Sequence, residues 1–316
     1  MDWRQLWEIV SAPDNVPIVG LIPLLIFYIY LAWKQAKAND ELIAELETNS
    51  AMAKTHHRKS WPFRPGWQKE IHVWPFLLRI EFLAAMIVSI ILMVWSITLS
   101  APLEEPSNPN LTMNPAKAPW YFLGLQEMLV YYDPWLAGVV FPGLIIVGLG
   151  AIPYLDTNPK GNGYFTLKER KAAISIFLFG FLILWILLVI LGTFLRGPNW
   201  NFFGPYEYWD VHKLEALVNV NLSEFIWVKG LHMALPTNPL IREMFGFIII
   251  LAYFLMIPPI MAKKWFKEFY ASLGPIRYQI MMFLMLSMAA LPIKMVLRWL
   301  FNLKYIVGIP EYFFNI

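Results

Sequence analysis

Residues 171–192 have the sequence KAAISIFLFGFLILWILLVILG, in which the first lysine is the only charged side chain. The hydrocarbon core of a bilayer is about 30 Å thick, and about 20 consecutive apolar residues in a helix cross it. The apolar stretch continues to Leu195, so it meets that requirement. We therefore predict a transmembrane helix over 172–195 and an integral membrane fold.

The same length criterion identifies five further apolar runs along the chain. The composition agrees, because 58% of the 316 residues are hydrophobic and only 15% are charged. The first run follows an acidic start without a basic region, which is typical of a retained helix and not of a signal peptide. We predict an all-α membrane protein with six transmembrane helices at about 16–34, 72–100, 136–155, 172–195, 243–262 and 279–301.

The charges of the connecting loops predict the orientation, because short cytoplasmic loops carry an excess of Lys and Arg. Three loops are basic, at 54–69, 160–171 and 263–277, and we assign them to the negative side of the membrane. Segments 101–135 and 197–242 then fall on the positive side. The charged stretch 35–60 is interpreted as a solvated helical linker.

The chain has no cysteine, which excludes a disulfide, a thiolate zinc site, a Cys-ligated iron–sulfur cluster and a covalently attached c-type haem. Ligation of b haem by two histidines needs pairs that project inward from transmembrane helices. The five histidines instead lie outside the predicted helices or at a helix end: His56, His57, His72, His212 and His232. We therefore expect this chain to ligate no haem and no metal.

The loop between the second and third predicted helices carries the most specific pattern. Pro119, Trp120, Tyr121 and Phe122 open an apolar stretch that is too short to cross a bilayer, and proline is favoured in the first turn of a helix. Glu127 is then expected on the same helical face as Trp120. Aromatic rings beside a carboxylate at the membrane surface suit a quinol, although interfacial aromatics with a solvated glutamate are the alternative.

Residues 70–197 resemble subunit IV of cytochrome bf complexes, which corresponds to the C-terminal half of cytochrome b in bc complexes. The resemblance rests on HVWPFLLRIEFLAAMIVSIIL, APLEEPSNPN, NPAKAPWYF and the helices that follow. In the family, the loop motif is Pro-Glu-Trp-Tyr in the quinol-oxidation site, whereas this chain has Ala118-Pro119-Trp120-Tyr121. Because proline accepts no proton, Glu127 is our candidate acceptor and Asp133 the runner-up.

The resemblance implies a haem-free subunit of a quinol:cytochrome c-type reductase that translocates protons. It also implies a shared quinol/quinone site and a dimeric complex. The expected partners are a haem-bearing N-terminal cytochrome b subunit with the b-type haems, a Rieske-type iron–sulfur protein and a c-type cytochrome. We expect a bacterial cytoplasmic membrane. A non-catalytic membrane anchor or scaffold of a redox complex is the alternative, and a transporter ranks last because no inverted repeat is found.

The remaining segments complete three predicted domains, namely 1–71, 72–197 and 198–316. Arg79 and Glu81 lie just inside the second helix and are candidates for the border of a quinone pocket on the negative side, with snorkelling to the surface as the alternative. The aromatic cluster within 197–242 is interpreted as an interfacial belt, with a docking surface for a peripheral electron carrier as the alternative. The first, fifth and sixth helices are expected to contact additional subunits.

Overall fold

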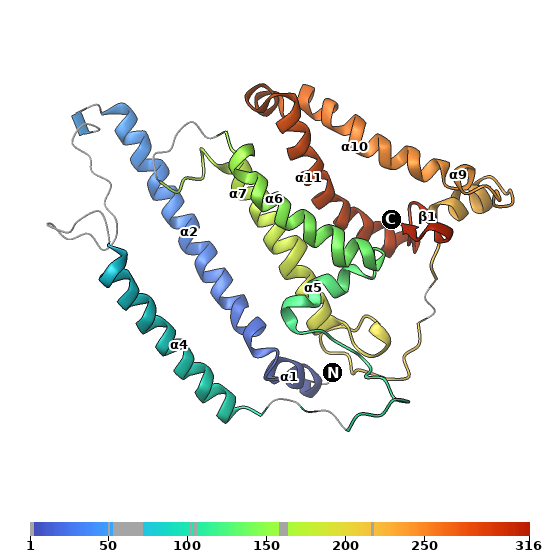
Figure 1. The fold of residues 1–316 in the computed structure, drawn as a ribbon, viewed down its shortest axis with the longest axis horizontal. Helices are drawn as coiled ribbons and strands as arrows, with labels where there is room; N and C mark the ends of the chain where they lie inside the picture. Colours follow the sequence, from blue (N-terminus) through green and yellow to red (C-terminus); the bar gives the residue numbers. More distant parts are fainter. Residues whose placement is uncertain are drawn as a thin grey trace. The chain divides into compact units, whose positions relative to one another are not determined.

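A computed structural model describes residues 3–49, 51–52, 72–100, 103, 106–157, 164–215 and 218–316, and this part of the chain is mainly helical with almost no strands (Figure 1). The six predicted spans and the all-α membrane fold are confirmed. Among the described residues, the helices long and apolar enough to cross a membrane are Val16–Thr48, Val73–Thr98, Leu136–Leu155, Lys171–Leu195, Met244–Lys264 and Lys267–Phe301.

The chain divides into two compact units. The first unit comprises Met1–Ile9, Asn110–Gly163 and Ala172–Ile316, and the second comprises Val10–Pro109 and Tyr164–Lys171. The short helix α1 (Trp3–Ser11) begins in the first unit and ends in the second.

In the second unit, helix α2 (Val16–Thr48) is longer than its apolar run. The charged stretch after residue 34 continues the same helix as far as Thr48, because it is rich in Ala, Leu, Glu and Lys and has neither Gly nor Pro. Asn39 donates a hydrogen bond to the Phe165 carbonyl at 2.8 Å, and the Asp40 carboxylate accepts the Lys168 backbone N–H at 3.2 Å. Part of the predicted linker therefore anchors the loop at 164–168.

The second unit also holds helix α4 (Leu78–Thr98), which follows a π-helical turn, η1 (Val73–Leu77). None of the residues of α4 is buried, and its apolar side chains are outward-facing on all sides. A helix that is hydrophobic all round is stable only when lipid or another protein covers it. This helix therefore fits a bilayer.

The first unit holds four of the spans and a short helix, α5 (Trp120–Met128). The span Leu136–Leu155 consists of η2 (Leu136–Val140) and α6 (Phe141–Leu155). The span Lys171–Leu195 alternates between α-helical and π-helical turns. Its elements are α7 (Lys171–Leu178), η3 (Phe179–Ile186), α8 (Leu187–Ile190) and η4 (Leu191–Leu195).

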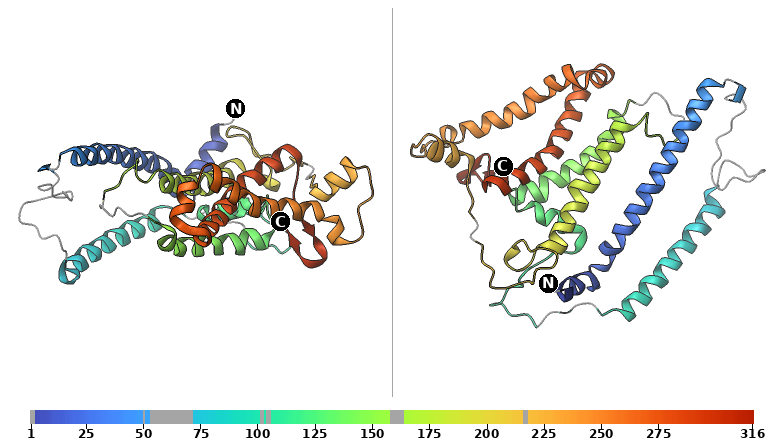
Figure 2. Two further views of the ribbon diagram at one scale, coloured as in Figure 1. Left: turned by 90° about the horizontal axis from the view of Figure 1, so that it is seen from above. Right: turned by 180° about the vertical axis from the view of Figure 1, so that it is seen from behind.

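The last two spans, α10 (Met244–Lys264) and α11 (Lys267–Phe301), form an antiparallel pair that meets at their connection (Figures 1 and 2). The Tyr278 hydroxyl donates to the Pro258 carbonyl at 3.0 Å, and the Tyr253 hydroxyl donates to the Leu286 carbonyl at 2.8 Å. Helix α11 begins earlier than predicted and is broken at Gly274, whose φ of +73° is followed by Pro275. Much of the predicted basic loop 263–277 is therefore helical.

Short elements fill the connections of the first unit. They are η5 (Pro198–Trp200), η6 (Glu224–Gly230), α9 (Pro239–Arg242), β1 (Gly308–Ile309), η7 (Pro310–Tyr312) and β2 (Phe314–Asn315). The strands β1 and β2 pair antiparallel, with Gly308 opposite Asn315. Residues 218–222 run beside 302–305, since the Lys304 N–H donates to the Val220 carbonyl at 2.8 Å.

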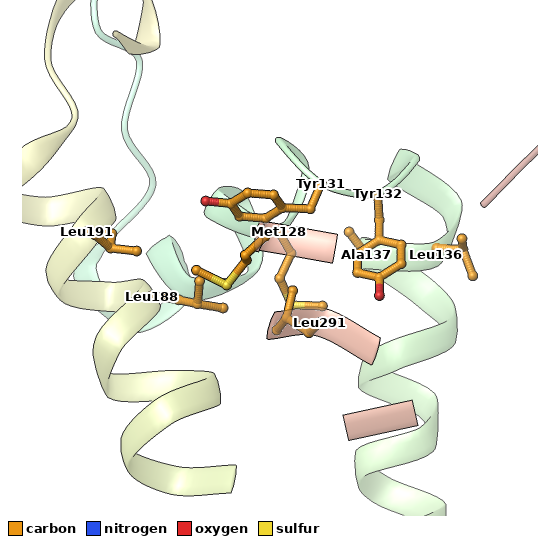
Figure 3. Close-up of a cluster of buried hydrophobic side chains, with 9 residues drawn as sticks. Met128, Tyr131, Tyr132, Leu136, Ala137, Leu188, Leu191 and Leu291 are labelled. Atoms are coloured by element: carbon orange, nitrogen blue, oxygen red, sulfur yellow. The ribbon is translucent and has the colours of Figure 1, made fainter. Parts of the chain in front are cut away.

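The main hydrophobic core of the first unit lies where α5, η2, α8 and α11 meet (Figure 3). Met128 of α5 packs with Leu188 from the span Lys171–Leu195 and with Leu291 of α11. Two glycines allow α5 to approach this span closely. A Cβ on Gly192 would lie 3.3 Å from the Leu123 carbonyl oxygen, and a Cβ on Gly124 would lie 3.4 Å from Val189. This core fixes α5 on the ends of the membrane helices.

Candidate functional site

The start of helix α5 is held by a side chain from its own second turn. Pro119 occupies the N-cap position, one residue before the helix, and its carbonyl accepts the Phe122 N–H at 2.8 Å. The Gln126 amide accepts the Ala118 N–H and donates to the Ala116 carbonyl, each at 2.8 Å. The Gln126 side chain therefore holds the loop motif against the helix that follows it.

The three aromatic residues after Pro119 have different surroundings. Trp120 is partly buried and its ring lies 6.2 Å from that of Trp185, measured between centroids. Tyr121 and Phe122 are exposed, with their rings 4.8 Å apart. The exposed pair gives α5 an aromatic surface on the side away from the core.

The opposite face of α5 is buried and contains the predicted carboxylate. Leu123, Gly124, Glu127 and Met128 are the buried residues of this helix. Glu127 has no exposed surface at all. A charged group without access to water needs partners, because burying an unpaired charge is costly.

Glu127 is surrounded by hydrogen-bond donors from three other positions. Arg196 donates to the carboxylate through both Nη2, at 2.7 Å, and Nε, at 3.0 Å. The Tyr131 hydroxyl donates at 3.0 Å and the Trp200 indole N–H at 3.1 Å. Both carboxylate oxygens are thus occupied, in a fork-shaped ion pair of the strong, bidentate kind.

The charges in this network change the acid–base properties of its members. Burial by itself would lower the pKa of Arg196, but the hydrogen bonds and the charge of Glu127 outweigh burial and raise it. Burial, and then the negative charge of Glu127, raise the pKa of the Tyr131 phenol well above its ordinary value. Arg196 is therefore cationic and Tyr131 a neutral donor at every physiological pH.

The loop after the span Lys171–Leu195 adopts an unusual backbone to place the Trp200 indole. Asn199 and Trp200 have φ values of +59° and +56°, in the left-handed region that bulky residues avoid. Asn114 accepts the Asn199 N–H at 2.6 Å, and Arg196 Nη1 donates to the Trp200 carbonyl at 3.0 Å. The Glu127 network therefore supports a strained turn.

Sequence reasoning did not identify Arg196 and Trp200. Arg196 is the first charged residue after the 24 apolar or neutral residues that follow Lys171, and a cation at the end of a span usually indicates only a membrane boundary. A buried glutamate in the neighbouring loop is the signal that would have pointed to it, because such a group requires a cationic partner.

The other predicted site residues lie elsewhere. Asp133 is partly exposed and accepts from the Asn315 side chain at 3.2 Å. Arg79 and Glu81 are exposed in the first turn of α4, in the second unit. His72, His212 and His232 are exposed and outside the spans, and His56 and His57 lie outside the described residues. Within the described part, no group of three His, Asp or Glu residues is arranged to hold a metal ion.

The fold and this loop define a class, namely a multi-pass, all-α integral membrane protein with a short surface helix anchored across the ends of its spans. Residues 106–206, about a third of the chain, match the family described as cytochrome b (C-terminal)/b6/petD. The match includes α5, the span Lys171–Leu195 and the turn at Trp200. Comparisons with curated proteins and with solved structures gave no match.

The family indicates a subunit of a multi-subunit, bc-type oxidoreductase complex that takes part in electron transport in a membrane. The predicted resemblance is confirmed for the segment that contains the loop motif. Helix α4 lies before the matched residues, so its predicted resemblance stays a prediction, as does the division into three domains.

Proposed function

We propose that this chain is the haem-free cytochrome b subunit of a quinol:cytochrome c-type reductase and forms one wall of the quinol-oxidation site. The observation that carries the proposal is the arrangement of α5. This helix belongs to the matched segment, is buried on one face and exposes Tyr121 and Phe122 on the other. Flat aromatic surfaces at the membrane boundary suit a quinone ring.

In this proposal, Pro119, Trp120, Tyr121 and Phe122 shape the pocket, and the redox centres belong to partners. One electron of the quinol passes to a Rieske-type iron–sulfur protein and on to a c-type cytochrome, and the other passes to b haems of an N-terminal cytochrome b chain. The protons leave on the positive side, so turnover builds a gradient. A dimeric complex in a bacterial cytoplasmic membrane is part of the same proposal.

The proton acceptor is the least direct part of the proposal. Proton acceptance at Glu127 requires the ion pair with Arg196 to open, because both carboxylate oxygens are occupied and no surface of the residue is exposed. With the pair closed, Glu127 is a positioning residue that holds α5 and the Trp200 turn. Asp133 or a carboxylate of the haem-bearing partner then accepts the proton.

On the negative side, Arg79 and Glu81 remain our candidates for a quinone pocket. Both side chains are exposed at the start of α4 and have no polar partner among the described residues. Charged groups at this depth are available to a ligand or to the lipid headgroups.

A non-catalytic anchor is the second candidate function, and one observation favours it. The position of the family's motif glutamate is Pro119 here, and the nearest carboxylate on the buried face of α5 is fully engaged in the Arg196 network. A chain that had lost its acid–base group and kept its packing would have these features.

Purification of the native complex separates the two functions. We expect b haem in reduced-minus-oxidised spectra and quinol oxidation that falls at least about tenfold in the Tyr121→Ala and Phe122→Ala variants. Tyr312→Ala is the matched control, because Tyr312 is an exposed aromatic residue at 75% accessibility away from α5. Unchanged turnover in both α5 variants would reject the quinol wall, and a haem-free complex would favour the anchor.

A further inference from the structure

A pocket of about 310 Å³ opens beside the C-terminal end of α5, within the first unit. Its polar lining is made of three cations and three amides, and it contains no carboxylate. These residues are Arg196, Arg298, Lys304, Gln126, Asn199 and Asn219. The exposed aromatic residues Tyr121 and Phe122 lie at the other end of the helix, so this pocket is distinct from the proposed quinol wall.

Two of the three cations have no carboxylate partner. Glu127 neutralises Arg196, whereas none of the ion pairs formed by the described residues involves Arg298 or Lys304. Arg298 is only 9% exposed and donates to the carbonyls of Val218 and Asn302, at 3.2 and 3.0 Å. Carbonyl dipoles satisfy hydrogen bonds but supply no negative charge.

Lys304 binds the end of α5 in the same way. Its Nζ donates to the carbonyls of Leu129 and Val130, each at 2.9 Å, at the helix terminus that attracts cations. Burial, and then the positive charge of Arg298, lower the pKa of Lys304 to about 8, and Asp133 opposes this shift. Lys304 therefore carries most of its charge at neutral pH, next to a second cation.

A third basic side chain lies behind the pocket. Lys294 is 2% exposed, one helical turn before Arg298, and its Nζ donates to the Lys304 carbonyl at 2.7 Å. Basic groups this close repel one another, and of the two nearby carboxylates Glu127 is engaged by Arg196 and Asp133 forms no ion pair with these groups. Binding of an anion from outside the chain would relieve this repulsion, and the pocket gives such an anion access to the basic groups.

We propose that this pocket binds a phosphate group. Proteins usually bind phosphate oxygens with guanidinium and ammonium groups, and amide donors add further hydrogen bonds. The pocket lies at the ends of the membrane spans, where lipid headgroups are found. The phosphate comes either from the headgroup of an anionic phospholipid or from free inorganic phosphate.

The test uses the full chain and a variant that places a negative charge in the pocket. Asn219 is exposed, lines the pocket and has no hydrogen bond to another described residue, so Asn219→Asp adds a carboxylate without removing a contact. Asn238→Asp is the matched control. It adds the same charge outside the pocket, where Asn238 caps α9 by accepting the Leu240 N–H, a bond that aspartate also makes.

Two probes distinguish the sources of phosphate. Native mass spectrometry measures retention of phosphatidylglycerol against phosphatidylcholine, and thermal unfolding measures the response to inorganic phosphate against chloride at equal ionic strength. We expect one of these anions to bind the unmodified chain and Asn238→Asp equally, and to bind Asn219→Asp at least about tenfold more weakly. Retained phosphatidylglycerol identifies the lipid, and a response to inorganic phosphate alone identifies the free ion.

A second variant removes the pocket's charge instead of opposing it. Arg298→Gln keeps a donor near the Val218 carbonyl and deletes one cation, so it is also expected to weaken anion binding about tenfold or more. Equal anion binding in the unmodified chain, Asn219→Asp and Arg298→Gln would overturn the proposal. So would the absence of binding by both probes.

Discussion

The ion pair between Glu127 and Arg196 gives the sharpest prediction. Glu127→Gln keeps the size of the side chain and removes its charge, which leaves the Arg196 guanidinium unpaired at 12% side-chain exposure. Breaking a buried pair from one side typically costs about 3–5 kcal/mol. We expect the lower end of that range, because Arg196 keeps its bond to the Trp200 carbonyl. Denaturant unfolding of the full chain in detergent measures this free energy.

The double variant Glu127→Gln/Arg196→Gln tests whether the unpaired charge of Arg196 causes the loss of stability. It removes both charges, so no unpaired charge stays buried, and we expect it to recover at least half of the lost stability. A single variant within about 1 kcal/mol of the unmodified chain would refute the structural role of the pair.

Quinol oxidation by the two variants distinguishes the possible roles of Glu127. If the carboxylate acts by positioning α5, the double variant recovers turnover together with stability. If it accepts the proton, both variants stay slow, by about 10²–10⁴-fold for loss of a general base. In that case, Pro119→Glu, which restores a carboxylate at the family's motif position, is expected to recover part of the rate.

Three further outcomes follow from the fold. Gly192→Ala pushes a methyl group into α5 at 3.3 Å and should destabilise the chain by about 1–3 kcal/mol in the same unfolding assay, whereas Gly150→Ala has no neighbour within 4 Å and should be neutral. Anion binding at the cationic pocket should weaken as the pH rises through about 8, because Lys304 is charged below its pKa and neutral above it; a flat titration from pH 7 to about 9 would contradict this. Single cysteines introduced at 101–135 should react with an impermeant label from outside intact cells, and those at 263–277 should not.

The membrane fold was predictable because its signal is one of length and composition. Each of the six apolar runs forms a span, since a run of about 20 apolar residues has no other stable place for its backbone and side chains. The ends of the helices were less predictable. Helix α2 continues to Thr48 and α11 starts at Lys267 because charged residues with high helix propensity extend a helix beyond the apolar core.

The candidate site was predictable only as far as local spacing reaches. Spacing placed Glu127 on the same helical face as Trp120, but it did not predict that this carboxylate is fully buried. Two of the partners of Glu127, Arg196 and Trp200, come from a loop about 70 residues later, and the position of Trp200 depends on two left-handed backbone residues. No periodicity in one sequence contains that information, because the contact is made by tertiary packing.

The bonds of Lys304 to the end of α5 also have a consequence for the order of biosynthesis. The ribosome makes Lys304 175 residues after Leu129, so α5 enters the membrane surface long before this lysine exists. Until then the carbonyls of Leu129 and Val130 lack the Lys304 ammonium that binds them in the folded chain. The last contacts at the end of α5 therefore form only after the final span, α11, has been synthesised.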